Sequence, residues 1–353
     1  MISNSLLEYT DMRNKKIRVA VGMSGGVDSS VAAGLLKEQG YEVTGVFLEC
    51  WKEPGCRAEG DRKDALKVAL KLKIPFKVVD FRREYRRKVI DWFYEEFRKG
   101  RTPNPDVKCN KEVKFGLFLD WVKKNGFDYM ATGHYARVED GRLFRGVDER
   151  KDQTYFLAMV NKDQLRRVMF PIGGLIKDEV RQEAKKRGIH VWDKRDSTGI
   201  CFIGHDYSFE NFLKRRIKEH EGEVVDLKGE VIGKHKGYEF YTIGQRHGFT
   251  VHPRSTKVKA LYVVKKDAKA NRLVVGGKKD LGRREFKVED WHWIGGKRPK
   301  GRLLCRIRHQ ARLIGCEVKG KIVRLDQAEQ GVAEGQIGVV YKGKECFGGG
   351  VIS

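Results

Sequence analysis

The chain has 353 residues, which is too long for one compact domain of ordinary size, so we expect two or three domains. Its formal net charge of +25 favours a polyanionic partner, although a solvated lysine-rich surface would give the same composition. No uncharged apolar run is long enough to cross a bilayer and the first residues lack a signal-peptide pattern, which excludes a membrane-embedded class and leads us to expect a soluble, cytoplasmic protein.

The first part of the chain alternates short apolar runs with helical patterns. After an initial strand, a first helix is expected from about residue 31. Three more helices are expected at 61–73, 86–99 and 110–124. Strands are expected at 17–22, 41–48, 76–80 and 128–132. This alternation predicts an α/β fold with a parallel sheet covered on both faces. Ligands of such sheets bind beyond the carboxyl ends of the strands, which gathers Ser24–Ser30, Leu48 and Gly133-His134 around one crevice.

The pattern changes beyond about residue 205, where one more helix is expected near 209–218. Short strand-like runs separated by glycines then predict a small β-rich domain, at 223–231, 238–243, 261–264 and 273–275. A last set of runs is typical of a compact β-barrel, at 303–308, 317–325, 336–341 and 345–352. We therefore expect three domains, at 1–205, 206–285 and 286–353.

A glycine- and serine-rich segment, Ser24-Gly25-Gly26-Val27-Asp28-Ser29-Ser30, joins the first strand to the first helix. Its glycines let the backbone approach an anion, and the free N–H groups of the helix start can bind phosphate. It is not a Walker loop, because no Gly-Lys-Ser/Thr ends it. Many segments of this composition are simple turns. This one, with seven residues in this order, resembles the pyrophosphate loop of the ATP pyrophosphatases, which adenylate a carbonyl oxygen and release pyrophosphate.

The seven cysteines are odd in number and irregularly spaced, which argues against a disulfide framework. No pair of CxxC units indicates a zinc site. Cys109 follows two prolines at the expected start of a helix, where the helix N-terminus and the flanking Lys108 and Lys111 favour the thiolate. Cys201 lies in a polar loop bounded by glycines. The remaining cysteines of the last segment are expected in the barrel core, at positions 305, 316 and 346.

The segments Pro103–Phe115 and Asp196–Gly204, together with the loop at Ser24–Ser30, resemble the tRNA-specific 2-thiouridylases. Shorter matches share this resemblance, at Ala131–Tyr135, Lys151–Phe156, Thr242–Arg246 and Cys346–Gly350. The likeness runs from about residue 17 to the end of the chain. It implies a Rossmann-like catalytic domain of the adenine nucleotide alpha hydrolase type, followed by a tRNA-binding central domain and a β-barrel. The family places sulfur at C2 of the wobble uridine of tRNA.

The resemblance also implies the chemistry. ATP with Mg²⁺ adenylates the uridine oxygen, and AMP later departs with that oxygen. The family motif assigns the persulfide to Cys201 and the nucleophile to Cys109, with a Cys109–Cys201 disulfide as by-product. The persulfide sulfur would come from a donor protein such as a cysteine desulfurase or sulfur carrier. Asp106 is the candidate acid or base, although its carboxylate could instead cap the helix.

Binding residues follow from the same motifs. For ATP the resemblance implies Gly22, Met23, Ser24, Gly25, Gly26, Val27, Asp28, Ser29, Leu48 and Gly133. For the target base it implies Asn104, Pro105 and Asp106. For the anticodon arm and the rest of the tRNA it implies His134, Lys151, Asp152, Gln153, Arg308, His309 and Gln336. Phosphate contacts by basic side chains would explain the net charge.

Several alternatives remain open. The segment 49–56 departs from the common family pattern, and its Cys50 and Cys56 are either incidental or part of a redox or metal function. An iron–sulfur cluster held by Cys109, Cys201 and a third ligand is one such function. Trp291 and Trp293 could stack on bases, but strand alternation favours packing. The alternative functions are another RNA-modifying or amidating ATP pyrophosphatase and a non-enzymatic RNA-binding module, which would leave the loop at Ser24 unexplained.

Overall fold

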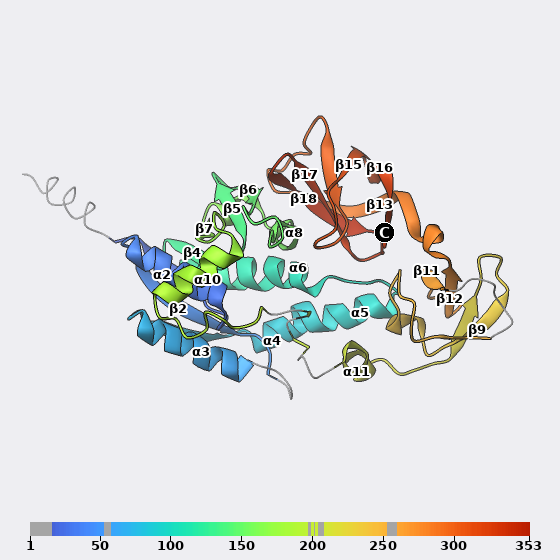
Figure 1. Cartoon of the computed structure of the whole chain (residues 1–353), viewed down its shortest axis with the longest axis horizontal. Coiled ribbons are helices and arrows are strands. Elements are labelled where there is room, and N and C mark those ends of the chain that lie inside the picture. The colour runs from blue at the N-terminus through green and yellow to red at the C-terminus, as the bar shows by residue number, and fades with distance from the viewer. Residues whose placement is uncertain (1–15, 53–57, 197–198, 201, 204–207, 253–259) are drawn as a thin grey trace, which may run out of the picture.

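The computed structural model describes residues 16–52, 58–196, 199–200, 202–203, 208–252 and 260–353. The chain forms three β-sheets arranged along a long axis (Figure 1). A parallel sheet lies at one end, and a small sheet with β9 (Val231–His235) and β12 (Arg272–Gly276) lies at the other. A barrel lies between them along that axis. None of the described helices is long and apolar enough to span a membrane.

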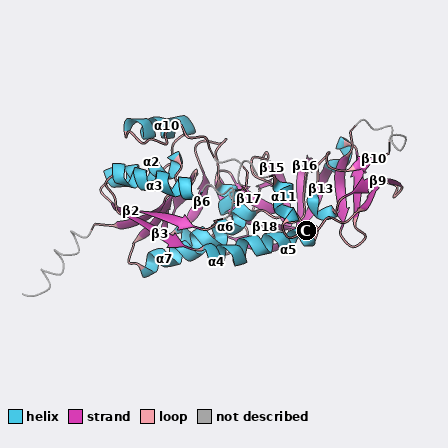
Figure 2. Ribbon diagram, turned by 90° about the horizontal axis from the view of Figure 1, so that it is seen from below, coloured by secondary structure: helices cyan, strands magenta, loops and turns pink. Residues whose placement is uncertain are grey.

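The parallel sheet has the strand order β3-β2-β1-β4-β7. Its strands are β1 (Arg18–Gly22), β2 (Glu42–Glu49), β3 (Phe76–Asp80), β4 (Tyr129–Thr132) and β7 (Val168–Met169). Successive residues of β1 are buried on opposite faces, since Val19 and Val21 pack in one core and Ala20 packs in another. Helices α2 (Val27–Glu38), α3 (Ala58–Lys71) and α10 (Lys177–Lys186) cover one face, and α7 (Leu119–Lys124) covers the other (Figure 2). The prediction of a parallel sheet covered on both faces is confirmed.

Two long helical segments are each built from α-helical and π-helical parts. The first runs through α4 (Arg82–Tyr85), η1 (Arg86–Asp91) and α5 (Trp92–Arg98). The second runs through α6 (Pro105–Cys109), η2 (Asn110–Phe118) and α7. The sequence placed the start of this second helix at residue 110, which is wrong by five residues. The helix begins earlier because Pro105 stands at its first position and the Asn104 side chain accepts a hydrogen bond from the Val107 N–H at 3.1 Å.

Several short elements between β4 and residue 205 escaped the sequence analysis. They are β5 (Ala136–Glu139), β6 (Arg142–Arg145), α8 (Thr154–Leu157), α9 (Lys162–Leu165) and α10. The four-residue elements contain only two repeats of the strand period or about one helical turn, so periodicity gives too little signal to reveal them. The omission of α10 matters most, because its first residue enters the candidate site.

The small sheet has the order β10-β9-β8-β12-β11 and is preceded by α11 (Phe209–Lys214). Its strands are β8 (Gly222–Val225), β9 (Val231–His235), β10 (Thr250–Val251), β11 (Tyr262–Asp267) and β12 (Arg272–Gly276). The strand expected over 238–243 is wrong, since Tyr238–Phe240 forms a 3₁₀-helix, η3. The residue before it, Gly237, has a φ of 127°, a backbone conformation that residues other than glycine rarely adopt. This conformation turns the chain out of the extended strand geometry.

The barrel consists of the antiparallel strands β13, β16, β15, β14, β17 and β18, and pairing of β13 with β18 closes it. The strands are β13 (Gly282–Trp293), β14 (Leu303–Arg306), β15 (Ile314–Lys319), β16 (Ile322–Gln330), β17 (Ile337–Lys342) and β18 (Glu345–Ile352). Three cysteines are buried in it as predicted, at 305, 316 and 346. The rings of Trp291 and Trp293 stack on each other with centroids 4.6 Å apart, and both pack against the barrel core, so the packing prediction is confirmed.

The barrel is fused to the N-terminal part of the chain. Strand β18 pairs with β6, which extends the barrel sheet to β5. Ile337 and Tyr341 of β17 also share a hydrophobic core with Tyr155 and Leu157 of α8. The N-terminal part and the barrel therefore share one buried core.

We therefore expect a chain cut after residue 205 not to fold, because the cut removes one side of a buried core. Thermal unfolding followed by circular dichroism would test this. A cooperative unfolding transition of the shortened chain, at any temperature, would contradict it.

Candidate active site

The segment Ser24–Ser30 forms a tight turn into the start of α2. The Ser29 hydroxyl accepts a hydrogen bond from the Ser24 N–H at 3.1 Å, and the Ser30 hydroxyl donates to the Gly26 carbonyl at 2.7 Å. The helix-capping residue Gly26 supplies no side chain to the helix N-terminus. The first N–H groups of a helix have no acceptor within that helix, so an anion fits here. The segment thus forms the glycine-rich turn into a helix start that the sequence predicted, and we call it the phosphate-binding turn after its predicted role.

The carboxyl ends of neighbouring strands converge on this turn. The Met23 N–H donates to the Val46 carbonyl of β2 at 2.8 Å. Gly133, directly after β4, lies so close to the turn that a Cβ atom there would come within 2.5 Å of the Ser29 nitrogen. The turn, β2 and Gly133 therefore lie together, as predicted, and the β2 residue that contacts the turn is Val46, two residues before Leu48.

This contact makes Gly133 a sensitive position. We expect Gly133→Ala to weaken ATP binding by at least about tenfold, because the new methyl group displaces the backbone of the phosphate-binding turn. Titration calorimetry with ATP would measure the effect. Gly174→Ala, whose Cβ would meet nothing within 4 Å, is the matched control, and equal affinity of both variants would contradict the expectation.

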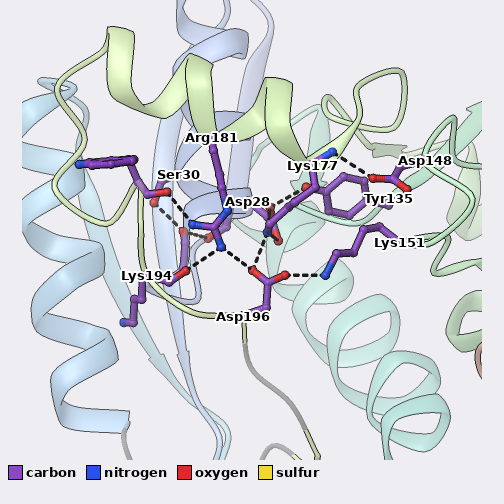
Figure 3. A network of polar contacts seen from close by, with 12 residues as sticks. Asp28, Ser30, Tyr135, Asp148, Lys151, Lys177, Arg181, Lys194 and Asp196 are labelled. Atoms are coloured by element: carbon purple, nitrogen blue, oxygen red, sulfur yellow. Dashed lines mark hydrogen bonds and ion pairs between the residues drawn. The ribbon is translucent and has the colours of Figure 1, made fainter.

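A network of charged side chains surrounds Asp28, the acidic residue of the turn (Figure 3). The Lys177 ammonium lies 2.7 and 3.0 Å from the two Asp28 carboxylate oxygens, and the Tyr135 hydroxyl donates to one of them at 2.9 Å. Lys177 also lies 2.8 Å from Asp196. Asp196 in turn lies 2.6 Å from the ammonium of Lys151, a predicted tRNA contact.

The predicted nucleophile Cys109 is the last residue of α6, inside the continuous helix. It is a free, buried thiol that packs with Val113 and Phe202. Burial raises the pKa of this thiol to about 12, and only Lys114 opposes the rise. The expectation that a helix start, Lys108 and Lys111 favour the thiolate is therefore wrong for this arrangement.

The reactivity of Cys109 should follow this burial. Since its pKa is raised, the thiolate fraction at pH 8 should be roughly 1,000-fold below that of free cysteine and should rise with pH towards 12. We expect alkylation by iodoacetamide, followed by mass spectrometry, to be correspondingly slow in the isolated protein. Alkylation at the rate of free cysteine would contradict the buried placement.

The second thiol, Cys201, lies outside the described residues, and so does Cys56. The structure therefore tests neither the predicted disulfide nor the cluster that Cys201 would complete. Two neighbours of Cys201, Ile200 and Phe202, pack in the core that contains Cys109, and Cys50 packs against the same core.

Asp106 and Asn104 precede Cys109 on the same helix. The helix cap is Asn104, so the alternative that Asp106 caps the helix is wrong. Burial raises the pKa of the Asp106 carboxyl, with Lys114 opposing. A carboxyl with a raised pKa holds its proton more firmly than a free aspartate, which suits a role as acid or base.

Several predicted tRNA contacts are engaged within the protein. His134 is buried, its Nδ1 lies 2.7 Å from the Thr132 hydroxyl, and burial holds its pKa well below the usual value. Asp152 is 1% exposed and binds Arg306 at 2.9 Å. The Gln153 side chain accepts from the Tyr135 N–H at 2.9 Å. The side chains of His134 and Asp152 are thus placed as structural groups, and tRNA contacts at these positions find no support in this arrangement.

The barrel brings one predicted tRNA residue, Gln336, to the approach to Cys109. The Gln336 side chain donates to the Thr102 carbonyl at 2.7 Å, two residues before Asn104. His309 packs against Phe156 with ring centroids 4.3 Å apart and tilted planes, and Arg308 beside it is exposed. Gln336, far from Asn104 in the sequence, therefore lies next to the Asn104–Asp106 segment.

The residues present differ in how well they fit the expected cofactors. The bare N-terminus of α2 fits a phosphate. Asp28 does not fit as a direct Mg²⁺ ligand in this arrangement, because Lys177 and Tyr135 occupy its carboxylate oxygens. Among the described residues, no group of three or more His, Cys, Asp or Glu side chains converges as a metal site.

Sequence reasoning missed Lys177, Tyr135 and Lys114 as site residues. Tyr135 belongs to the segment Ala131–Tyr135 that matches the family, but the sequence predicted no function for it. Lys177 begins α10, and the acidic residues of its first turn followed by basic residues in the last could have indicated a helix there. Its contact with Asp28, 149 residues away, is a tertiary feature that no local pattern contains.

The parallel sheet covered on both faces by helices is that of a Rossmann-like α/β domain. Family models match nearly the whole chain: a tRNA methyl transferase HUP domain at residues 17–205, a tRNA methyl transferase PRC-barrel domain at 210–277 and an aminomethyltransferase beta-barrel domain at 283–352. The tRNA-specific 2-thiouridylase MnmA of Pediococcus pentosaceus is 44% identical, with 96% of each chain covered. The tRNA-specific 2-thiouridylase MnmA of Francisella tularensis subsp. novicida is 43% identical, with 97% of this chain and all of the relative covered.

Solved structures are more remote. A 4-thiouridine synthetase–RNA complex with bound ATP is 16% identical over 54% of this chain and 46% of that one, with a TM-score of 0.37. An NMN synthetase from Francisella tularensis is 17% identical over 59% and 76%, with a TM-score of 0.34. The full-length relatives decide the family: the chain belongs to the tRNA-specific 2-thiouridylases.

Proposed function

We propose that this chain converts uridine to 2-thiouridine at the wobble position of tRNA, using ATP and a persulfide sulfur. The observation that carries the proposal is the proximity of two sites. Gly133 packs on the phosphate-binding turn, and the next residue, His134, packs against Phe115 of the helix that bears Cys109, with ring centroids 5.8 Å apart. A nucleotide at the turn and a base beside Asp106 and Cys109 would thus share one edge of the sheet.

In the first half-reaction the uridine O2 attacks the α-phosphorus of ATP. The bond from that phosphorus to the β-phosphate bridging oxygen breaks, and pyrophosphate leaves. The free N–H groups at the start of α2 support this step by stabilising the phosphate charge. The adenylated oxygen then becomes a good leaving group, which uridine O2 is not.

In the second half-reaction the terminal sulfur of a Cys201 persulfide attacks C2, and AMP leaves with the original oxygen. Cys109 then attacks the Cys201 sulfur, and the S–S electron pair stays with the sulfur on C2. The products are 2-thiouridine and a Cys109–Cys201 disulfide, which a thiol reductant must reduce by two electrons. Asp106 is our candidate to take up and return protons, which its raised pKa favours. Cys109 reacts only after deprotonation, so we expect its burial to change when tRNA binds.

The proposed reaction also requires a bound tRNA, a sulfur donor and a cellular compartment. The bound RNA would be the anticodon arm, with Lys151, Arg308 and Gln336 beside it. A cysteine desulfurase or sulfur carrier would supply the persulfide, Mg²⁺ would accompany ATP, and the reaction would take place in the cytoplasm. We assign catalysis to residues 1–205, a contribution to tRNA binding to the β-rich domain at 206–285, and further tRNA contacts to the barrel at 286–353.

An iron–sulfur cluster held by Cys109, Cys201 and a third ligand is the competing use of these thiols. Iron content and visible absorption of anaerobically purified protein distinguish the two uses. If the persulfide route holds, protein with less than one iron atom per chain should still thiolate tRNA at the full rate.

The proposed reaction is tested with purified protein and an unmodified tRNA transcript that carries a wobble uridine. With Mg-ATP, a desulfurase and cysteine, we expect 2-thiouridine, AMP and pyrophosphate in equal amounts. A transcript with cytidine at the wobble position is the control. AMP formation without any 2-thiouridine would favour an amidating or other ATP pyrophosphatase, and RNA binding without AMP would favour a binding module.

A further inference from the structure

The Lys177 ammonium is the centre of the network in Figure 3. Its side chain is 7% exposed, and three carboxylate oxygens lie within 3.0 Å of it, two from Asp28 and one from Asp196. The two carboxylates position this ammonium firmly, because without them it would be an uncompensated buried charge.

The backbone fixes Lys177 as well. Lys177 is the first residue of α10, and its N–H donates to the Asp148 carboxylate at 3.1 Å. Helix α10 packs on α2, the helix that follows the phosphate-binding turn. The ammonium therefore lies at the N-terminal end of α2, where the phosphates of a nucleotide would bind.

Asp196 connects this lysine to other cations. Its carboxylate lies 2.6 Å from the Lys151 ammonium and 3.4 Å from the Arg181 guanidinium. Asp196 thus keeps two cationic partners even when Lys177 is drawn towards another anion. Asp28, in contrast, has only Lys177 and the neutral Tyr135 hydroxyl as its side-chain partners among the described residues.

The segment 194–196 is attached to the phosphate-binding turn at a second point. The Lys194 ammonium donates to the Gly25 carbonyl at 3.0 Å and lies 2.8 Å from Asp61 and 2.7 Å from Asp64 of α3. Lys194 therefore attaches this segment directly to the turn, and Asp196 connects it to Asp28 of the turn through Lys177. Five residues further along the chain stands Cys201.

We propose that Lys177 is a catalytic residue of adenylation that binds the phosphates of ATP, and that Asp196 is a positioning residue that links this lysine to the sulfur-transfer half of the reaction. In the absence of nucleotide, Asp28 and Asp196 hold the ammonium. A triphosphate at the start of α2 competes for it with a higher charge, and Asp196 then relies on Lys151 and Arg181. This inference rests on the proposed function and adds two residues that the family motifs did not assign.

Measuring both half-reactions separates the two roles. Full-length variants receive Mg-ATP and unmodified tRNA, with a desulfurase and cysteine, and the AMP released and the 2-thiouridine formed are both quantified. We expect Lys177→Met to lower AMP release by about 100-fold or more and to raise the KM for ATP, since it removes a cation from the phosphates. Lys177→Arg should retain more activity than Lys177→Met, because the charge persists.

Asp196→Asn should behave differently. We expect AMP release within about threefold of the unaltered protein but thiolation lowered by about tenfold, because the positioning of the sulfur-bearing side is lost while the adenylate still forms. The ratio of AMP to 2-thiouridine should therefore rise well above one, as water returns the adenylated base to uridine and AMP. A merely structural role would lower both products together and leave the ratio unchanged.

The control is Lys186→Met, on the same helix, whose ammonium is 71% exposed and binds only Glu183 among the described residues. It should leave both rates unchanged. Normal AMP release by Lys177→Met, or an unchanged product ratio for Asp196→Asn, would overturn the inference. The unaltered protein must form both products in the same assay, which tests the proposed function separately.

Discussion

Asp28→Asn is expected to lower AMP formation by about 100-fold or more, while the affinity for tRNA stays nearly unchanged. The carboxylate binds the Lys177 ammonium with both oxygens and accepts from Tyr135, whereas an amide has one acceptor oxygen and no charge. The substitution therefore leaves a buried ammonium short of one partner beside the phosphates. Pyrophosphate release measures the first effect, and filter binding of labelled tRNA measures the second.

Asp163→Asn is a suitable control, since this carboxylate is 89% exposed and its one described partner is Arg166. It should support normal AMP formation. Normal AMP formation by Asp28→Asn would show that the phosphate-binding turn does not require this charge.

The second large effect concerns the two thiols. Incubated with a desulfurase and cysteine but without tRNA, Cys109→Ser should accumulate persulfide on Cys201 and should then fail to thiolate tRNA. Cys201→Ser should accumulate none at the site and should also fail, so both variants lose thiolation entirely. Mass spectrometry of alkylated peptides locates the persulfide. Free sulfide must be excluded, because it could bypass the carrier.

Cys316→Ala serves as the matched control, because Cys316 is buried in the barrel, away from the thiols of the site. It should accept and transfer sulfur normally. Persulfide on Cys109 of the Cys201→Ser protein, with thiolation retained, would reverse the two roles.

Local sequence patterns were sufficient for the scaffold of the site. The loop at Ser24–Ser30, the parallel strands and the closed barrel were all predictable, because each depends on short-range periodicity or on a residue order that few segments share. The convergence of β2 and Gly133 on the loop followed from one general property of parallel sheets. The helix that bears Cys109 was misplaced because the capping Asn104 was not recognised as its start.

Tertiary environment accounts for what the sequence did not reveal. The raised pKa of Cys109 comes from burial beneath side chains such as Phe202, which a local argument from flanking lysines cannot include. Lys177 meets Asp28 only because α10 packs on α2. The burial of His134 and Asp152 is equally a result of packing, since their motif positions alone suggested exposed contacts.

The central claim is tested most directly by the nucleosides of tRNA from cells that lack this protein. We expect digestion and mass spectrometry to show 2-thiouridine derivatives absent from the wobble position, and a plasmid copy of the gene to restore them. A copy encoding Cys109→Ser should not restore them. Undiminished wobble 2-thiouridine in the deletion strain would contradict the assignment.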